Sequence, residues 1–192
     1  DRSVFRRLGL VQDANSIRVP GSGVDLNRLA LTPMPQRQGN DPVRFLFVGR
    51  LLKDKGVREF VEAVRLLRQE GSNVHARMLG SSTSDNPAAV QLEELQSWIR
   101  DGLVEHIEHC DDVRPWLAAA DCVVLPSYRE GVPRSLLEAG AMGRPLISTD
   151  APGWRDAVNA GRSGYLCPIK SPQALADSMR SFLSLSSKEQ QQ

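Results

Sequence analysis

The chain has 192 residues, of which 41% are hydrophobic and 24% charged; this balance is typical of a soluble globular protein and excludes wholesale disorder. Lys and Arg number 24 against 23 Asp and Glu, and the resulting net charge of +1 argues against a dedicated nucleic-acid-binding protein. No apolar run approaches the roughly 18 residues that a membrane-spanning helix needs.

Short apolar runs rich in β-branched and aromatic residues alternate along the chain with longer amphipathic runs. Residues 43–49, VRFLFVG, form the first apolar run and predict a buried strand. Residues 56–70 carry an apolar stripe at helical spacing, which predicts a helix that Gly71 ends. The same alternation predicts, in chain order, a strand at 74–80, a helix at 91–102, a strand at 104–109, a helix at 114–120, a strand at 122–127, a helix at 134–143, a strand at 144–149, a short helix near 153–160, a strand at 164–168 and a helix at 171–185.

The two ends of the chain differ from this alternating region. Residues 1–42 contain prolines at 20, 33, 35 and 42 and the sequence GSG at 21–23, so we expect a lead-in and linker there. Residues 43–187 are expected to form one domain. The polar tail at 188–192 is expected to fray.

Strands that alternate with helices predict βαβ units and a parallel sheet. The predicted fold class is therefore α/β, a Rossmann-like doubly wound parallel sheet of about six strands with helices on both faces. Ligands of such sheets bind beyond the carboxyl ends of the strands, where the strand order reverses. The residues that directly follow each strand are therefore the candidates for a binding site.

The turn after the first strand, GRLLKDKG at 49–56, places two cations near one strand end. Gly49 lets the backbone approach a ligand closely, and Arg50 and Lys55 together suit a phosphate or diphosphate. The spacing matches neither a Walker loop nor a G-x-G-x-x-G fingerprint. The alternative is that Arg50 and Lys55 are solvated loop charges.

The segment after the fourth strand, residues 126–143, combines two acids with a helix start. Gly131 and Val132 bring backbone N–H groups to that start, which is a favourable place for a phosphate. Glu130 and Glu138 accept hydrogen bonds, which suits the adjacent hydroxyls of a ribose or hexose. The alternative is a capped helix with a surface Glu and a Glu that pairs with a nearby Arg.

Metal and disulfide chemistry have little support in the sequence. The three cysteines, Cys110, Cys122 and Cys167, are odd in number and widely spaced, and no C-x-x-C motif exists. His106 and His109 would point to opposite sides of a strand, so a shared metal ion is not expected. No secretory segment opens the chain, which favours a cytoplasmic protein.

Taken together, these motifs resemble a known enzyme family. FLFVGRLLKDKG followed by SYREGVPRSLLEAGAMGRPLISTD is similar to the carboxy-terminal half of retaining glycosyltransferases of the GT-B architecture, family 4 (group 1). Glu130 and Glu138 match the two acids of that family's E-x7-E motif. PGSGVDLNRL at 20–29 and PGWRDAVNAGRSGYLCP at 152–168 resemble flanking segments, so the resemblance covers about Pro20 to Leu185.

The resemblance implies a nucleotide-sugar-binding domain at 43–187 and a role for each matched residue. Arg50 and Lys55 would grip the donor diphosphate, Glu130 would contact the transferred sugar, and Glu138 would hold the ribose hydroxyls. Residues near Ile107 to His109 would flank the base, although Glu108 stands where the family usually has glycine and Asp156 where Glu is common. The implied catalytic residues are Arg50, Lys55 and Glu130, and the implied nucleotide-sugar-binding set is Gly49, Arg50, Lys55, Gly80, Ile107, His109, Glu130, Gly131, Val132, Pro133, Ser135, Leu136 and Glu138.

The resemblance also implies the partners of the domain. The donor would be a nucleotide diphosphate sugar, most simply UDP-linked, with neither metal nor other cofactor. The closest likeness is to bacterial surface-polysaccharide enzymes, which transfer a sugar such as an N-acetylhexosamine to a polysaccharide or lipid-linked acceptor in O-antigen or capsule synthesis. Residues 1–42 would lead from an N-terminal acceptor domain that this sequence lacks. The isolated chain would then be inactive, and the parent enzyme would sit peripherally at the inner membrane face.

Two other interpretations stay open on the sequence. The chain is alternatively a non-catalytic Rossmann-like module that binds a partner protein. It is otherwise the domain of a GT-B phosphorylase or starch-type synthase, for which an ADP preference would be expected. The sequence by itself leaves the transferred sugar, the base, the acceptor, the linkage and the oligomeric state undetermined.

Overall fold

The structure is a computed structural model, and it describes residues 2–17, 22–82, 86–151, 158 and 163–185. Within these residues, six strands form one all-parallel sheet in the order β3-β2-β1-β4-β5-β6. The strands are β1 (Val43–Val48), β2 (Val74–Leu79), β3 (Glu105–Ile107), β4 (Cys122–Leu125), β5 (Leu146–Thr149) and β6 (Gly164–Cys167). The predicted fold class, a doubly wound Rossmann-like sheet, is confirmed.

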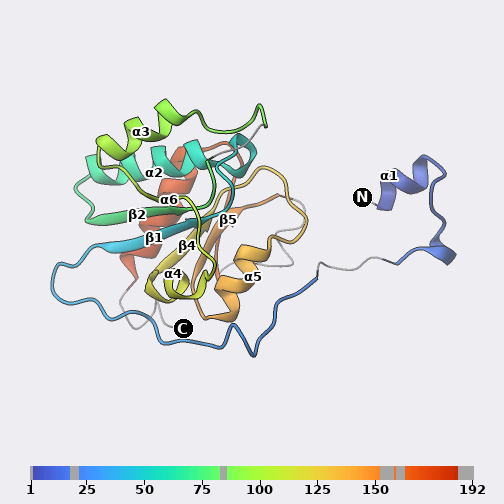
Figure 1. The fold of residues 1–192 in the computed structure, drawn as a ribbon, viewed down its shortest axis with the longest axis horizontal. Coiled ribbons are helices and arrows are strands. Elements are labelled where there is room, and N and C mark those ends of the chain that lie inside the picture. The colour runs from blue at the N-terminus through green and yellow to red at the C-terminus, as the bar shows by residue number, and fades with distance from the viewer. Residues whose placement is uncertain (1, 18–21, 83–85, 152–157, 159–162, 186–192) are drawn as a thin grey trace.

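The helices cover both faces of this sheet, as Figure 1 shows. They are α2 (Val57–Gln69), α3 (Leu92–Arg100) and α6 (Pro172–Ser184) on one side, and α4 (Arg114–Ala119) and α5 (Arg134–Ala141) on the other. α6 returns from the β6 edge to pack against α2. This arrangement follows from right-handed crossovers between parallel strands.

The core is formed by the apolar residues that the sequence pattern assigned to the buried sides of helices and strands. The stripe of α2 is fully buried, as its helical spacing predicted, and it belongs to the same core cluster as the buried residues of the central strands β1 and β4. Phe47 lies 5.8 Å from Phe60 of α2, measured between ring centres. Every residue of β4 is buried, because both faces of the central sheet are covered.

Some boundaries and elements differ from the sequence prediction. β3 ends at Ile107 rather than 109, so His109 lies in the following loop. The lead-in contains a short helix, α1 (Arg2–Arg7), and a 3₁₀ turn, η1 (Asp13–Asn15), which periodicity did not indicate. The short helix expected near 153–160 and the tail at 188–192 lie outside the described residues, apart from Val158, which is buried.

Part of the expected lead-in packs directly on the domain. Leu29 is buried, and the Thr32 amide donates to the Met142 carbonyl at 3.3 Å. The buried Arg144 side chain donates to the carbonyl oxygens of Thr32 and Pro33. This stretch therefore contributes to the folded unit, because backbone carbonyls buried beside Arg144 need these hydrogen bonds.

Candidate functional site

The strand order places a switch point between β1 and β4. The chain runs from β1 outward to β2 and β3, then returns to β4 beside β1 and continues to β5 and β6. In open parallel sheets the ligand crevice lies at this reversal, beyond the carboxyl ends of the two strands. The two segments that the sequence singled out, after Val48 and after Leu125, directly follow these strands.

The segments after β1 and β4 are joined by backbone contacts. After β1 the chain forms the 3₁₀ turn η2 (Lys53–Lys55), and the Asp54 carbonyl accepts from the Tyr128 amide at 2.8 Å and the Ser127 hydroxyl at 3.1 Å. Gly56, with φ of 72°, closes the turn, and a Cβ there would lie 2.1 Å from the Pro126 carbonyl oxygen. Only glycine fits this close approach, which brings the two segments together.

Lys55 and Glu130 meet at this junction as an ion pair between Lys55 Nζ and Glu130 Oε1. Both side chains are largely buried, with 13% and 21% of their surfaces exposed. Such partly desolvated charges interact more strongly than solvated ones. The sequence separately nominated these residues, 75 positions apart, and the fold brings them into contact.

Arg50 lies apart from this pair. It is exposed, two residues after β1 ends, and forms no ion pair with the other described residues. The structure therefore joins one of the two candidate cations to Glu130 and leaves the other in solvent.

The start of α5 has open backbone donors. Pro133 is the residue before the helix, with φ of −71° and ψ of 120°, rather than the first helical residue. Pro133 has no side-chain acceptor, so it makes no side-chain capping hydrogen bond at the helix start. The amides of the first turn, which includes Ser135, therefore keep the partial positive charge that receives phosphate groups. Leu136, from the same turn, is buried in the core.

Glu138 lies one turn further along α5 and pairs with Arg134. The distance from Arg134 Nε to Glu138 Oε1 is 2.9 Å, and only 15% of the Glu138 side chain is exposed. This contact is the one expected under the alternative interpretation of a Glu held by a nearby Arg. A carboxylate in this position still has lone pairs for further hydroxyl donors.

The expected base-binding region lies at the ends of β2 and β3. The Gly80 amide donates to the Ile107 carbonyl at 2.9 Å, and a Cβ at Gly80 would lie 2.1 Å from the Gly49 carbonyl oxygen. Gly80 therefore allows β1 and β2 to end side by side. His109, by contrast, has 79% of its side chain exposed and lies 3.3 Å from a carboxylate oxygen of Asp111.

Glu108, which stands where the family usually has glycine, has a structural role that the sequence did not predict. Its carboxylate accepts from the Ser81 hydroxyl at 2.9 Å and from the Ser82 amide and hydroxyl at 3.1 and 2.8 Å. These bonds tie the loop after β3 to the loop after β2. A glycine at this position would lack them.

Sequence reasoning missed a second cluster beside the junction. Tyr128 donates its hydroxyl to Glu59 of α2, and Lys170 Nζ lies 5.2 Å from the centre of the Tyr128 ring. Burial and the Glu59 carboxylate raise the pKa of Tyr128, so its hydroxyl stays protonated. The only sequence signal was the position of Tyr128 just after β4.

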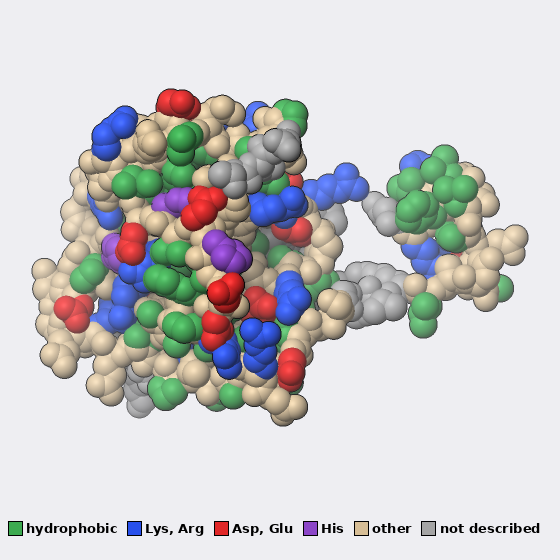
Figure 2. Space-filling model, in the orientation of Figure 1, with side chains coloured by type: hydrophobic (Ala, Val, Ile, Leu, Met, Phe, Trp, Pro, Cys, Tyr) green, Lys and Arg blue, Asp and Glu red, His purple; other side chains and the backbone are tan. Residues whose placement is uncertain are grey.

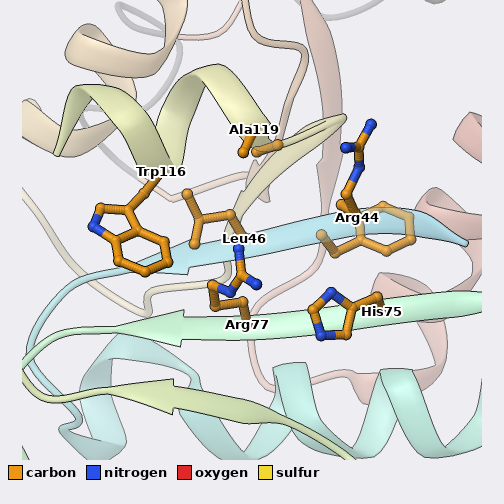
Figure 3. Close-up of a pocket in the computed structure, with 8 residues that line it drawn as sticks. Arg44, Leu46, His75, Arg77, Trp116 and Ala119 are labelled. Atoms are coloured by element: carbon orange, nitrogen blue, oxygen red, sulfur yellow. The ribbon is translucent and has the colours of Figure 1, made fainter. Parts of the chain in front are cut away.

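Other features of the described residues are less suited to ligands. The hollow between β1, β2 and α4, shown in Figure 3, is lined in part by Arg77, which stacks on Trp116 at 5.1 Å from the ring centre. Its volume of about 10 Å³ has room for about one water molecule. Among the described residues, no group of three or more His, Cys, Asp or Glu side chains is placed to hold a metal ion.

The surface carries charges of both signs. Acidic and basic side chains interleave over the face drawn in Figure 2, in keeping with the net charge of +1. In the described part of the chain, no helix combines the length and apolarity that a bilayer span requires.

Comparison with known proteins gives consistent matches. Residues 42–184 match the sequence profile of the family described as glycosyl transferases group 1. The chain is 32% identical, over 181 residues, to the putative colanic acid biosynthesis glycosyltransferase WcaL of Escherichia coli K12, covering 90% of this chain and 43% of WcaL. It is also 32% identical over 138 residues to the N,N'-diacetylbacillosaminyl-diphospho-undecaprenol alpha-1,3-N-acetylgalactosaminyltransferase of Campylobacter jejuni, covering 72% of this chain and 35% of that enzyme.

Solved structures share the fold. Anabaena HepE, in its complex with UDP, superposes with a TM-score of 0.80 at 21% identity, covering 99% of this chain and 53% of HepE. This likeness establishes the architecture alone. The chain spans less than half of the length of the two curated relatives, so a complete relative contains as much sequence again and more.

Proposed function

Because this chain belongs to the glycosyl transferases of group 1, we propose that it is the donor-binding domain of a retaining glycosyltransferase. The donor would be a nucleotide diphosphate sugar, most simply UDP-linked, bound beyond the carboxyl ends of β1 and β4. The observation that carries the proposal is the meeting of Lys55 and Glu130 at the switch point, beside the uncapped start of α5. A cation, an acid and open amides at one strand junction suit a ligand that has both phosphates and hydroxyls.

Each charged residue would have a separate part in this reaction. Lys55 and Arg50 would bind the diphosphate and stabilise the negative charge that grows on it as the sugar departs. The first-turn amides of α5 would add their partial positive charge, so that these groups replace a metal ion. Glu130 would orient the transferred sugar, and Glu138 would accept from the ribose hydroxyls.

The resting contacts support these parts. Lys55 neutralises Glu130 before a donor arrives, so neither charge is buried without a partner. A diphosphate that draws Lys55 toward itself would release Glu130 to accept from the sugar. Ile107, at the end of β3, and the exposed His109 beyond it would flank the base, and the Gly131, Val132 and Pro133 backbone would approach the sugar and phosphate.

The whole enzyme would transfer a sugar, such as an N-acetylhexosamine, to a polysaccharide or lipid-linked acceptor. The names of the two curated relatives support this class, since one is assigned to colanic acid biosynthesis and the other to an undecaprenol-linked acceptor. The acceptor site would belong to an N-terminal domain joined through residues 1–42, and the parent enzyme would sit at the inner membrane face. This chain alone would then bind donor nucleotide and transfer nothing.

Calorimetric titration with UDP, GDP and ADP, and with uridine as the phosphate-free control, tests the proposal. We expect one diphosphate, UDP, to bind and uridine to bind much more weakly. Binding of ADP in preference to UDP would favour the synthase interpretation. If none binds, the titration is repeated with the full-length parent. Binding there would show that the site needs the other domain. No binding, together with self-association of the chain, would favour the non-catalytic module.

Replacing Lys55 by Ala tests the diphosphate contact. Because a charge-assisted contact contributes about 1.5–3 kcal/mol, UDP affinity should fall about 10-fold to 100-fold, and uridine affinity should hardly change. Arg100→Gln, which removes an exposed charge at the end of α3, is the control and should bind UDP normally. Equal losses for UDP and uridine in Lys55→Ala would contradict the assignment.

Replacing Glu138 by Ala tests the ribose contact, and here, unlike in Lys55→Ala, both ligands should be affected. Uridine and UDP share the ribose, so both affinities should fall by a similar factor of about 10. Arg134→Gln, which removes only the partner of Glu138, controls for loss of the ion pair. Unchanged affinity for both ligands in Glu138→Ala would remove this residue from the site.

A further inference from the structure

A second cavity lies beside the η2 turn, with Lys53 and Asp54 in its wall. Its volume is about 440 Å³, within the range of about 300–1,000 Å³ that small-molecule sites have. The described residues that line it come from four separate segments and are Lys53, Asp54, Glu59, Ala88, Tyr128 and Lys170. None of these residues belongs to the donor-binding set proposed above.

Two lysines line this cavity from different parts of the chain. Lys53 comes from η2 and Lys170 from the turn between β6 and α6, and neither forms an ion pair with another described residue. Unpaired cations that converge on one cavity attract an anionic group. A carboxylate or a phosphate fits this requirement.

The backbone of Lys170 is held in an unusual conformation. Its φ of 57° is the only left-handed value among the described non-glycine residues, and this conformation costs about 1–2 kcal/mol for a side-chain-bearing residue. The conformation is accompanied by the contact of Lys170 Nζ with the face of the Tyr128 ring, at 5.2 Å. This contact favours a position of the Lys170 ammonium group over the Tyr128 ring, although Lys170 is an exposed residue.

The wall also contains an acceptor without a donor. Glu59 Oε1 accepts from the Tyr128 hydroxyl, but Glu59 Oε2 is buried and has no hydrogen-bond partner among the described residues. A buried acceptor left in this state costs about 1–3 kcal/mol. This oxygen is out of reach of a ligand in the cavity, so the exposed carboxylate of Asp54 is the acceptor that a ligand hydroxyl would use, and it would also repel a bare anion.

We propose that this cavity binds an anionic monosaccharide, with its acid group between Lys53 and Lys170 and a hydroxyl donating to Asp54. The two lysines suit a negative charge, and the Asp54 carboxylate suits a hydroxyl donor beside it. A sugar acid or a sugar phosphate meets both requirements in one small molecule. The proposal stands independently of the donor site, because it uses none of the donor-site residues.

Titration of the ¹⁵N-labelled chain, followed by amide NMR, tests the proposal with four probes. Glucuronate and glucose 6-phosphate distinguish a carboxylate from a phosphate ligand, while glucose and inorganic phosphate each lack one half of the chemistry. At least one of the charged sugars should shift the amides of Lys53, Tyr128 and Lys170, with a dissociation constant of about 1 mM or below. Glucose and phosphate should bind at least about 10-fold more weakly.

Three variants link the binding to the cavity. Lys53→Gln removes one ammonium group, and Lys170→Gly removes the other while keeping a residue that adopts positive φ without strain. Each should weaken binding of the charged sugar at least about fivefold, and Arg100→Gln, the charge-matched control outside the cavity, should leave it unchanged. Because Lys53 and Lys170 are exposed, their replacement should not disturb folding.

The outcomes that overturn the proposal are specific. Absence of binding by both charged sugars at about 20 mM would exclude the site, since useful small-molecule sites bind more tightly. Inorganic phosphate binding as well as glucose 6-phosphate would refute the saccharide part. Equal affinity in wild type, Lys53→Gln and Lys170→Gly would refute the cavity as the location.

Discussion

Arg144 holds three segments of the domain together, and its replacement by Met should destabilise the fold strongly. The side chain is 2% exposed. Its Nη2 donates to the carbonyls of Pro33 at 3.0 Å and Met142 at 3.2 Å, and also to that of Thr32. Its Nη1 makes longer contacts, both 3.4 Å, to the carbonyls of Ala118 and Ala120.

The size of the effect follows from these contacts. Each hydrogen bond from a charged donor contributes about 1.5–3 kcal/mol, and the two N–H groups of Nη2, which several acceptors share, make the shorter contacts. Two costs offset part of this, since burial lowers the pKa of the Arg144 guanidinium and Nε has no partner among the described residues. We therefore expect Arg144→Met to lose about 3–5 kcal/mol, as for the breaking of other buried charged networks.

Equilibrium unfolding in urea measures this loss. With an m-value of about 2 kcal/mol per M, the midpoint should fall by roughly 2 M. Arg100→Met, at an exposed position, is the matched control and should stay within about 0.5 kcal/mol of wild type. Hydrogen exchange at the Thr32 amide, which donates to the Met142 carbonyl, should accelerate in Arg144→Met more than exchange in the central strands.

A small effect would refute this reasoning. If Arg144→Met unfolds within about 1 kcal/mol of wild type, the carbonyls around Arg144 are satisfied by water and the network adds little. If the Met variant does not fold, Arg144→Lys, which keeps the charge but loses the planar fork, should fold with a loss between those of wild type and Met.

Two further predictions concern thiols and pH. Burial raises the pKa of Cys122 and Cys167, the latter to about 11, so neither thiol should react with iodoacetamide in the native state. The partly exposed Cys110 should react slowly. Mass spectrometry that finds more than one adduct per folded chain would contradict this prediction. Burial, and next the charge of Arg77, lower the pKa of His75 in the folded state below its value in the unfolded state. The unfolded chain therefore takes up a proton at this residue more readily than the folded chain does. The free energy of unfolding should fall as the pH drops from about 7 through the folded pKa. His75→Gln should flatten this part of the stability curve, and an unchanged slope in urea titrations between about pH 7 and pH 5 would show that other groups are responsible.

Much of the fold follows from local pattern. The stripe on α2 and the apolar runs of β1 and β4 have periods that only one kind of element can bury, so their type and approximate bounds are readable. The ends are less certain, because the hydrogen bonds that stop a strand come from its neighbours. β3 stops at Ile107, where its pairing with β2 ends at Leu79, and no feature of residues 104–109 marks that point.

The candidate site divides in the same way. The chemical character of Lys55, Glu130 and Glu138, and their places after strands or on a helix, came from the sequence. The partner of Glu130 did not, since Glu130 contacts Lys55 across 75 residues, whereas Arg50, from the same motif as Lys55, stays in solvent. The Tyr128–Glu59 contact likewise depends on how α2 lies against the loop after β4.

The sequence by itself determined the kinds of elements, their alternation and the residues whose chemistry suits a nucleotide sugar, because these depend on near neighbours along the chain. Tertiary structure alone decided the strand order that puts β1 beside β4, and with it which charges meet. It also decided that residues near Thr32 belong with the folded domain, through the buried Arg144. The physical reason is that long-range packing selects among contacts that local preference leaves equally open.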